Sequence, residues 1–168
     1  MIMNNYLKNL NRIEFIISLA CTGKCKHCSE GDHKLVGEHI DPDIAAEAVL
    51  RIAEKHQIKS VMTFGGEPLL YPEAVCKIHS AATEAEIPKR QLITNGYFSK
   101  DPQRIQAVAS NLAKSGVNDV LLSVDAFHQE TIPLGYVSLF AKLSRKRMFG
   151  CVHILPGWLV RMPIIHTM

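Results

Sequence analysis

The chain has 168 residues, of which 47% are hydrophobic and 21% charged, and its formal net charge is +3 at pH 7. This length suits one domain, residues 1–168, with a sizeable core, and the composition is ordinary for a soluble globular protein. The weak charge excludes the broad basic stripe typical of nucleic-acid binders, so a nucleic-acid partner is not indicated. We interpret the short basic run Ser144–Arg147 as a solvated helix end.

Membrane and secreted classes are not indicated either. Residues 1–12 are polar and rich in Asn, unlike a signal peptide, and no apolar segment has the length needed to span a bilayer. We therefore expect a cytoplasmic, reducing location. In that setting the five cysteines indicate metal or redox chemistry before disulfides.

The first predicted strand covers residues 13–19, an apolar run that we interpret as buried on both faces. Three cysteines follow it, and a polar, glycine-flanked loop then reaches residue 37. Asp41 and Pro42 predict the start of a helix, because Asp caps free backbone N–H groups and Pro suits the first helical turn. Apolar residues at helical spacing carry this helix to about residue 56.

Strand and helix patterns then alternate along the chain. We predict a strand at 60–64, a helix at 72–86, a strand at 90–94, a helix from 102 to 116, a strand at 119–124, a polar loop at 125–130 and a helix from 133. Asp101–Pro102 repeats the earlier capping pair, and Gly116 suits a helix C-terminus. Four such alternations predict an α/β fold with a parallel sheet and right-handed crossovers.

The C-terminal part, about residues 144–168, departs from this cycle. Residues 151–155 are a candidate fifth strand, followed by Pro156–Leu159 and an apolar end without a helical pattern. A fifth strand without a covering helix would expose apolar surface. We expect either a fragment of a longer design or a partner that covers this edge, and we favour the fragment.

Cys21, Cys25 and Cys28 lie together in the loop after the first strand, where α/β folds place their chemistry. Thiolates bind soft metals, so zinc and iron–sulfur clusters are the candidates. A structural zinc site needs four ligands, and the nearest further candidates are His27 and His33. Three cysteines on a [4Fe–4S] cluster instead leave one iron open, as in catalytic metal sites, so the ligand count favours a cluster.

The cysteine spacing is joined by a characteristic segment after each of the next three strands. In chain order the segments are Cys21-x3-Cys25-x2-Cys28, Gly65-Gly66-Glu67-Pro68, Thr94-Asn95-Gly96 and Ser123-Val124-Asp125. Together they resemble the radical S-adenosylmethionine (radical SAM) superfamily over roughly residues 14–133. The resemblance implies a partial (β/α) barrel of the TIM-like radical SAM type, here truncated to about four or five strand–helix units.

The resemblance also implies two cofactors, a [4Fe–4S] cluster and S-adenosylmethionine. Cys21, Cys25 and Cys28 match the cluster ligands, and the methionine moiety of the cofactor would chelate the fourth iron. His27 matches a position, commonly aromatic, that lies beside the adenine.

The remaining cofactor contacts implied by the resemblance follow the other strands. Gly65 and Gly66 would let the backbone approach the ligand closely. Glu67 would accept a hydrogen bond from the methionine ammonium. Ser123 and Asp125 resemble the residues that hold the ribose or the carboxylate. Two further candidates lie at the end of the third strand, Thr94 and Asn95.

The implied reaction is reductive cleavage of S-adenosylmethionine to a 5′-deoxyadenosyl radical, which takes hydrogen from an unknown substrate. A reductant such as flavodoxin or ferredoxin would supply the electron, and no side chain is assigned as a catalytic acid or base. Two alternatives stay open. One is an iron–sulfur or electron-transfer protein that does not cleave the cofactor, and the other is a zinc-stapled structural module.

Several of these residues also have simpler interpretations. Asp125 could cap the segment that follows it. We expect Phe127 to be packed and His128 to lie at the surface. Cys76 suits a small buried position, one isolated Cys151 is weak support for a second cluster, and His33 and His39 suit exposed positions.

Overall fold

The computed structural model describes residues 9–28, 31, 36–147 and 151–154. Its sheet has five parallel strands in the order in which they occur in the chain. They are β1 (Arg12–Ile16), β2 (Ser60–Phe64), β3 (Lys89–Thr94), β4 (Asp119–Leu122) and β5 (Cys151–Ile154). The predicted parallel sheet is confirmed, and the candidate fifth strand pairs with β4.

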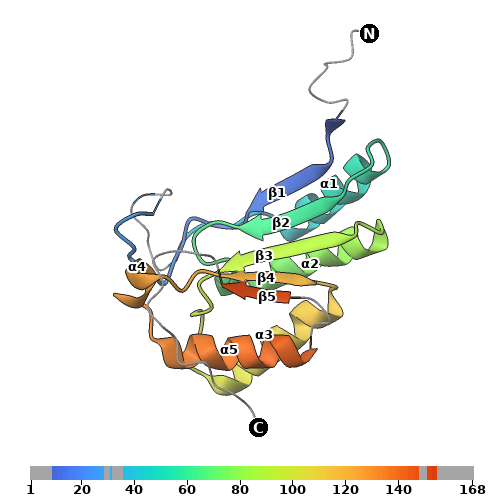
Figure 1. The fold of residues 1–168 in the computed structure, drawn as a ribbon. Helices are drawn as coiled ribbons and strands as arrows, with labels where there is room; N and C mark the ends of the chain where they lie inside the picture. The colour runs from blue at the N-terminus through green and yellow to red at the C-terminus, as the bar shows by residue number, and fades with distance from the viewer. Residues whose placement is uncertain (1–8, 29–30, 32–35, 148–150, 155–168) are drawn as a thin grey trace.

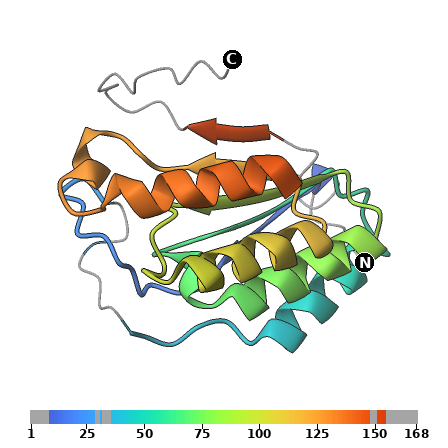
Figure 2. The ribbon, with the colours of Figure 1, turned by 90° about the horizontal axis from the view of Figure 1, so that it is seen from below.

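The connecting helices are α1 (Pro42–Ala53), α2 (Pro72–Glu84), α3 (Pro102–Lys114), α4 (Ala126–Gln129) and α5 (Leu134–Arg147), with a short 3-10 turn, η2, at Pro68–Leu70. The long helices α1, α2, α3 and α5 lie on one side of the curved sheet (Figures 1 and 2). Because the strands are parallel, the loops that leave the carboxyl ends of β1 to β4 gather at one edge of the sheet. Within the described residues, every helix falls short of the length and apolar character that crossing a bilayer requires.

The predicted helix starts at Pro42 and Pro102 are confirmed, and each carries the predicted Asp cap. The carboxylate of Asp41 accepts hydrogen bonds from the backbone N–H groups of Asp43 and Ile44, at 2.9 and 3.0 Å. These bonds hold the pKa of Asp41 below its ordinary value. Asp101 accepts from the backbone N–H of Gln103 in the same way. Each cap satisfies helix N–H groups that have no partner inside the helix.

The core lies between the sheet and the layer of long helices. The central strands place completely buried residues on this side, and α2 and α3 supply the facing apolar stripe. The completely buried residues of this core include Val61, Leu92, Val120, Val75, Ile78, Ile105 and Leu112. This packing fixes the strands, and so fixes the starting points of the loops at the carboxyl edge.

Several details differ from the sequence prediction, among them the ends of β1, at Ile16 instead of residue 19, and of β4, at Leu122 instead of residue 124. β1 is not buried on both faces: Ile16 is 47% exposed, because β1 is an edge strand with a neighbour on one side only. α1 ends at Ala53 instead of residue 56, and Ile44 is turned outward and 67% exposed. The predicted loop 125–130 contains the helical turn α4, which Asp125 caps.

The sequence predictions for the other cysteines and histidines have the following outcomes. Cys76 on α2 is partly buried, and burial raises the pKa of its thiol. His39 is exposed as predicted, with its ring against Tyr71. His33, residues 155–168 and the side chain of Cys151 lie outside the described part of the structure.

Candidate functional site

The three cysteines lie in one loop at the carboxyl end of β1 and line a common cavity of about 230 Å³. Their side chains are half-buried. The loop is shaped by its own backbone: the N–H of Gly23 donates to Sγ of Cys21 at 3.3 Å, and the N–H of Cys28 donates to the carbonyl of Cys25 at 3.1 Å. The predicted ligand set is thus gathered on one wall of a cavity.

The surroundings of Cys21 and Cys25 favour the protonated thiols when no cation is bound. Burial raises the pKa of Cys21, and burial together with the neighbouring Cys21 and Cys28 raises the pKa of Cys25 to about 11. A positively charged metal centre reverses this preference, because it binds the thiolate and releases the proton. The wall is therefore a set of soft donors whose charge a metal centre would compensate.

The turn after β2 packs directly on the loop that precedes the cysteines. Gly65 and Gly66 both have positive φ, +92° and +50°. A Cβ on Gly65 would lie 2.6 Å from Cγ2 of Ile16, and one on Gly66 would overlap the carbonyl of Ala20. The N–H of Glu67 donates to the same Ala20 carbonyl at 2.8 Å. Contact with this backbone is a reason for the two glycines that the sequence alone did not reveal.

Glu67 is completely buried and is not among the residues that line the cavity. Its Oε1 accepts hydrogen bonds from Oγ1 of Thr94 at 2.6 Å and from the N–H of Leu69 at 3.0 Å. Its Oε2 accepts from the N–H of Asn95 at 2.8 Å. Burial raises the pKa of Glu67 to about 7 despite these donors. The carboxylate thus joins the turn after β2 to the end of β3.

The end of β3 connects this buried carboxylate to the cysteine wall. Thr94 and Asn95 both line the cavity. Nδ2 of Asn95 donates to Oγ1 of Thr22 at 3.2 Å and lies 3.6 Å from Sγ of Cys21. Asn95, only a secondary candidate from sequence, is therefore the described side chain that orients Cys21 from a second strand.

The end of β4 supplies a further wall through Ser123 and His128 of α4, which Asp125 supports. Ser123 lines the cavity, and its N–H donates to the carbonyl of Thr94 at 2.9 Å. Asp125 caps α4: its Oδ1 accepts from both the N–H and Nδ1 of His128, at 3.0 and 2.8 Å. Burial opposes ionisation of Asp125, but the bonds from His128 outweigh it, so the pKa of Asp125 is lowered.

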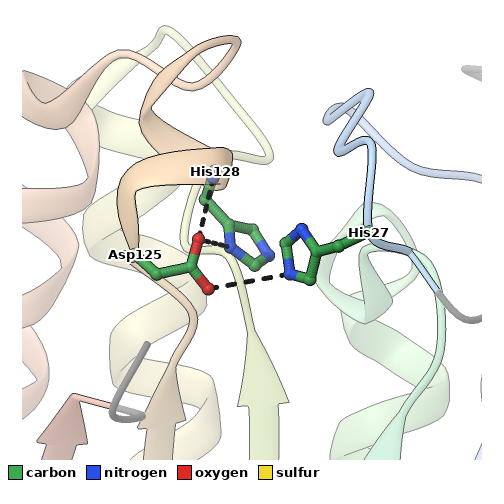
Figure 3. Close-up of side chains that lie close together, drawn as sticks. All are labelled: His27, Asp125 and His128. Carbon is green, nitrogen blue, oxygen red and sulfur yellow. Dashed lines mark hydrogen bonds and ion pairs between the residues drawn. The ribbon is translucent and has the colours of Figure 1, made fainter. Parts of the chain in front are cut away.

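His27, from the cysteine loop, faces this wall (Figure 3). Its Nε2 lies 3.7 Å from Oδ2 of Asp125, and its ring packs against the rings of Phe127 and His128. The sequence prediction that Phe127 is packed and His128 lies at the surface was wrong for both residues. Phe127 is 38% exposed, whereas the side chain of His128 is 18% exposed and lines the cavity.

Further contacts dock the cysteine loop on α4 and the residues after it. Nζ of Lys26 lies 3.1 Å from Oε2 of Glu130, and the N–H of Lys24 donates to Oγ1 of Thr131 at 3.2 Å. From sequence, the Asp125 cap indicated only that a helical turn follows it. The sequence did not indicate that this turn packs on the cysteine loop, because the two segments lie about a hundred residues apart.

The structure thus brings most of the predicted site residues together. Cys21, Cys25, Cys28, His27, Gly65, Gly66 and Ser123 line one cavity. Glu67 and Asp125 lie outside this lining and hold the residues that form it. The lining residues that the sequence did not indicate include His128, which was expected at the surface, and Gly23, Phe64 and Ile93.

Comparison with known proteins adds the following similarities. A protein-family model described as the Radical SAM superfamily matches residues 15–151. GTP 3',8-cyclase of Desulforamulus reducens is 25% identical over 132 residues, which are 77% of this chain and 38% of that protein. GTP 3',8-cyclase of Microcystis aeruginosa is 26% identical over 129 residues, 73% of this chain and 37% of that protein. The chain therefore spans less than two fifths of the length of these curated relatives.

Solved structures of similar shape include anSMEcpe with bound AdoMet and Cp18Cys peptide, with a TM-score of 0.62 at 19% identity, covering 85% of this chain and 41% of that one. BtrN in complex with AdoMet and 2-DOIA gives a TM-score of 0.57 at 19% identity, covering 86% of this chain and 56% of that one. At this level of identity the similarity concerns the fold, and it confirms the predicted α/β partial barrel.

Proposed function

Because the chain belongs to the radical SAM superfamily, we propose that its three-cysteine loop holds a [4Fe–4S] cluster and that the adjoining cavity binds S-adenosylmethionine. The observation that supports this most directly is the shared cavity. Three soft donors line one wall, and strand-end residues of β2, β3 and β4 line the rest. A three-thiol site leaves one metal position open toward that cavity.

The residues present fit both groups by their chemistry. Cys21, Cys25 and Cys28 would hold the cluster, and the raised thiol pKa values of Cys21 and Cys25 describe donors that need a cation to ionise. The Nδ2 group of Asn95 beside Sγ of Cys21 would orient that ligand and donate to its sulfur. Hydrogen bonds to ligating sulfurs are a general means of tuning a cluster's potential.

The proposed cofactor contacts follow the walls of the cavity. Backbone groups of Gly65 and Gly66 and the hydroxyl of Ser123 would bind polar parts of the cofactor. The planar ring of His27 would lie beside the adenine, and Asp125 would accept a hydrogen bond from the ribose. Asp125 becomes available for this contact when the His27 ring moves off its Oδ2, which lies 3.7 Å away.

We propose an indirect role for Glu67 in place of the direct contact expected from sequence. Its two oxygens already accept three hydrogen bonds from Leu69, Thr94 and Asn95. Glu67 would act as a positioning residue that sets the Gly65–Gly66 turn and Asn95 at their places around the cavity. This role explains why a carboxylate is buried there at the cost of a raised pKa.

When bound, the two cofactors supply one-electron reduction and a carbon-centred radical able to take hydrogen from a substrate. The chain itself would bind and orient them and exclude water from the cavity. We propose this class of reaction and no particular substrate, because the curated relatives are more than twice as long as the region that matches. A reductant such as flavodoxin or ferredoxin would be the redox partner, in a reducing compartment such as the cytoplasm.

Anaerobic reconstitution tests the proposal. The protein is treated with iron and sulfide, reduced, and mixed with S-adenosylmethionine, and 5′-deoxyadenosine is measured. We expect product from the wild-type chain and neither cluster nor product from Cys25→Ala. Cys76→Ala is the matched control, because Cys76 is a partly buried thiol on α2 outside the cavity. It should retain cluster and product.

The same experiment separates the alternatives. Cluster formation without 5′-deoxyadenosine would favour an iron–sulfur protein that does not cleave the cofactor. Tight zinc binding without labile sulfide would contradict both cluster interpretations. A zinc site using His27 as fourth ligand would require its ring to leave Asp125 and the two rings that it contacts.

A further inference from the structure

Two histidines and one aspartate, side chains of types that can bind metals, meet at the side of the cavity. His27 comes from the cysteine loop, Asp125 from the start of α4, and His128 from within α4 (Figure 3). Each offers one ligand atom, and the three atoms all lie within 4.8 Å of one another. Two imidazoles and one carboxylate therefore converge on a single volume, one from the cysteine loop and two from α4 and its cap.

The spacing of these atoms suits one metal ion. Nδ1 of His128 lies 2.8 Å from Oδ1 of Asp125, and Nε2 of His27 lies 3.7 Å from Oδ2 of Asp125. Ligands about 2.0–2.1 Å from a tetrahedral zinc are about 3.3 Å from one another, and at most about 4.2 Å apart in any geometry. The three ligand atoms lie within 4.8 Å of one another, so the imidazole rings would rotate toward a common point on binding. The ion would take the place of the proton between Nδ1 of His128 and Oδ1 of Asp125.

Two of the ligands are already held in place. The side chains of Asp125 and His128 are 14% and 18% exposed, and the α4 cap fixes their mutual orientation. His27 is 43% exposed and free to adjust, while the Lys26–Glu130 ion pair keeps its loop on α4. Such a partly preformed ligand set lowers the ordering cost of binding an ion.

We propose that His27, Asp125 and His128 form a second metal site, distinct from the cysteines, for one divalent cation of the Zn²⁺ or Co²⁺ type. Imidazole ligands select such ions over Mg²⁺ and Ca²⁺, which prefer all-oxygen sites. Three protein ligands leave a fourth position open to water or to another ligand. The ion would tie the cysteine loop to α4 across the side of the cavity.

One consequence rests on the proposed function. His27 and Asp125 are also the residues assigned there to the adenine and the ribose. The ion and S-adenosylmethionine would then use the same two side chains, so each would exclude the other. A divalent cation would act as a competitive ligand of this cavity without touching the cysteines.

Cobalt titration of a chain without the three cysteines tests the site. In the Cys21→Ala/Cys25→Ala/Cys28→Ala variant we expect one equivalent of Co²⁺, with visible ligand-field bands and no sulfur-to-cobalt charge-transfer band. Absence of these bands in a chain with native circular dichroism would overturn the proposal. This titration needs neither cluster nor cofactor, so its failure is separate from failure of the proposed function.

Ligand variants and a matched control complete the test. His128→Gln and Asp125→Asn should each weaken Co²⁺ binding by more than about tenfold, since loss of an outer partner alone costs 10- to 100-fold. His56→Gln, a histidine outside the cluster, should bind as the parent does. Equal binding in His128→Gln and the parent would contradict the assignment.

If the cysteine-free chain does not fold, the wild-type chain answers the same question. Thiolate-bound Co²⁺ gives charge-transfer absorption, whereas the proposed site does not, so the two sites are resolved in one titration. We expect a second equivalent that adds ligand-field intensity alone, and its loss in His128→Gln. Binding of the second equivalent that persists in His128→Gln would refute the site.

Discussion

Replacing Glu67 by Gln should change how the stability of the protein depends on pH. Glu67 is completely buried, and burial raises its pKa from 4.5 to about 7 in the folded chain. In the unfolded chain the carboxyl group is in water and ionises near its ordinary value. Between these two pKa values the folded state holds a proton that the unfolded state has released.

The sign and size of the effect follow from this difference. A raised folded pKa contributes stability that is fully present below pH 4.5 and is lost as the pH rises through about 7. At roughly 1.4 kcal/mol per pKa unit, the loss over this window is about 3 kcal/mol. His79, also buried, has its pKa lowered to about 3 by burial and by Arg90, so its contribution is lost as the pH falls. Glu67 and His79 therefore change the free energy of unfolding with pH in opposite directions, over overlapping pH ranges.

Comparison of variants isolates Glu67, because His79 is the same in both. We would measure the free energy of unfolding by urea at several pH values from 4.5 to 8 for the wild type and Glu67→Gln. The difference should shift by about 3 kcal/mol in favour of Glu67→Gln as the pH rises to 7. Glu73→Gln, which removes an exposed carboxylate on α2, is the matched control. A constant difference would refute the reasoning, and a shift of opposite sign would show that the three donors outweigh burial.

Other substitutions test the turn after β2, the end of β3 and the α3 cap. Gly66→Ala should lower the free energy of unfolding in urea by more than about 1 kcal/mol, since the φ of Gly66 is +50° and a Cβ would overlap neighbouring backbone. Gly135→Ala is the control: Gly135 has open space around it in α5, so this substitution should be neutral or stabilising. Asn95→Ala should reduce the iron retained after reconstitution without unfolding the chain, because it removes the amide beside Cys21; full retention would contradict the proposed orienting role. Asp101→Ala should cost about 1 kcal/mol of unfolding free energy through loss of the α3 cap, and an unchanged urea midpoint would contradict that.

The alternation of strands and helices could be predicted from sequence because its signals are local. The Asp–Pro pairs mark helix starts, and the strand Ser60–Phe64 was predicted with the bounds that the structure has. Burial of a strand is different, because it depends on which neighbours the strand acquires. The apolar run in β1 did not show that this strand lies at a sheet edge, where Ile16 is half exposed.

In the candidate site, too, the features that are local in sequence could be predicted and the contacts between distant residues could not. The three cysteines are close in sequence, so their grouping was predicted before any fold was known. The contacts of Glu67 with Thr94 and Asn95 join residues 27 or 28 positions apart, and those of Lys24 with Thr131 join residues 107 apart. Sequence indicated that these residues are polar and near strand ends. It did not indicate which would line the cavity and which would support it.

The order of the strands has a consequence for how the chain assembles. Each of the five strands lies beside the one that precedes it in the sequence, and none is inserted between two earlier strands. A chain emerging from the ribosome can therefore complete each unit on the edge left by the previous one, without displacing any pairing already formed. The cysteine loop emerges before β3 and α4, but its contacts with Asn95 and Thr131 form only after those two elements have been made. The wall that carries the cysteines is thus synthesised well before the contacts that fix it in place can form.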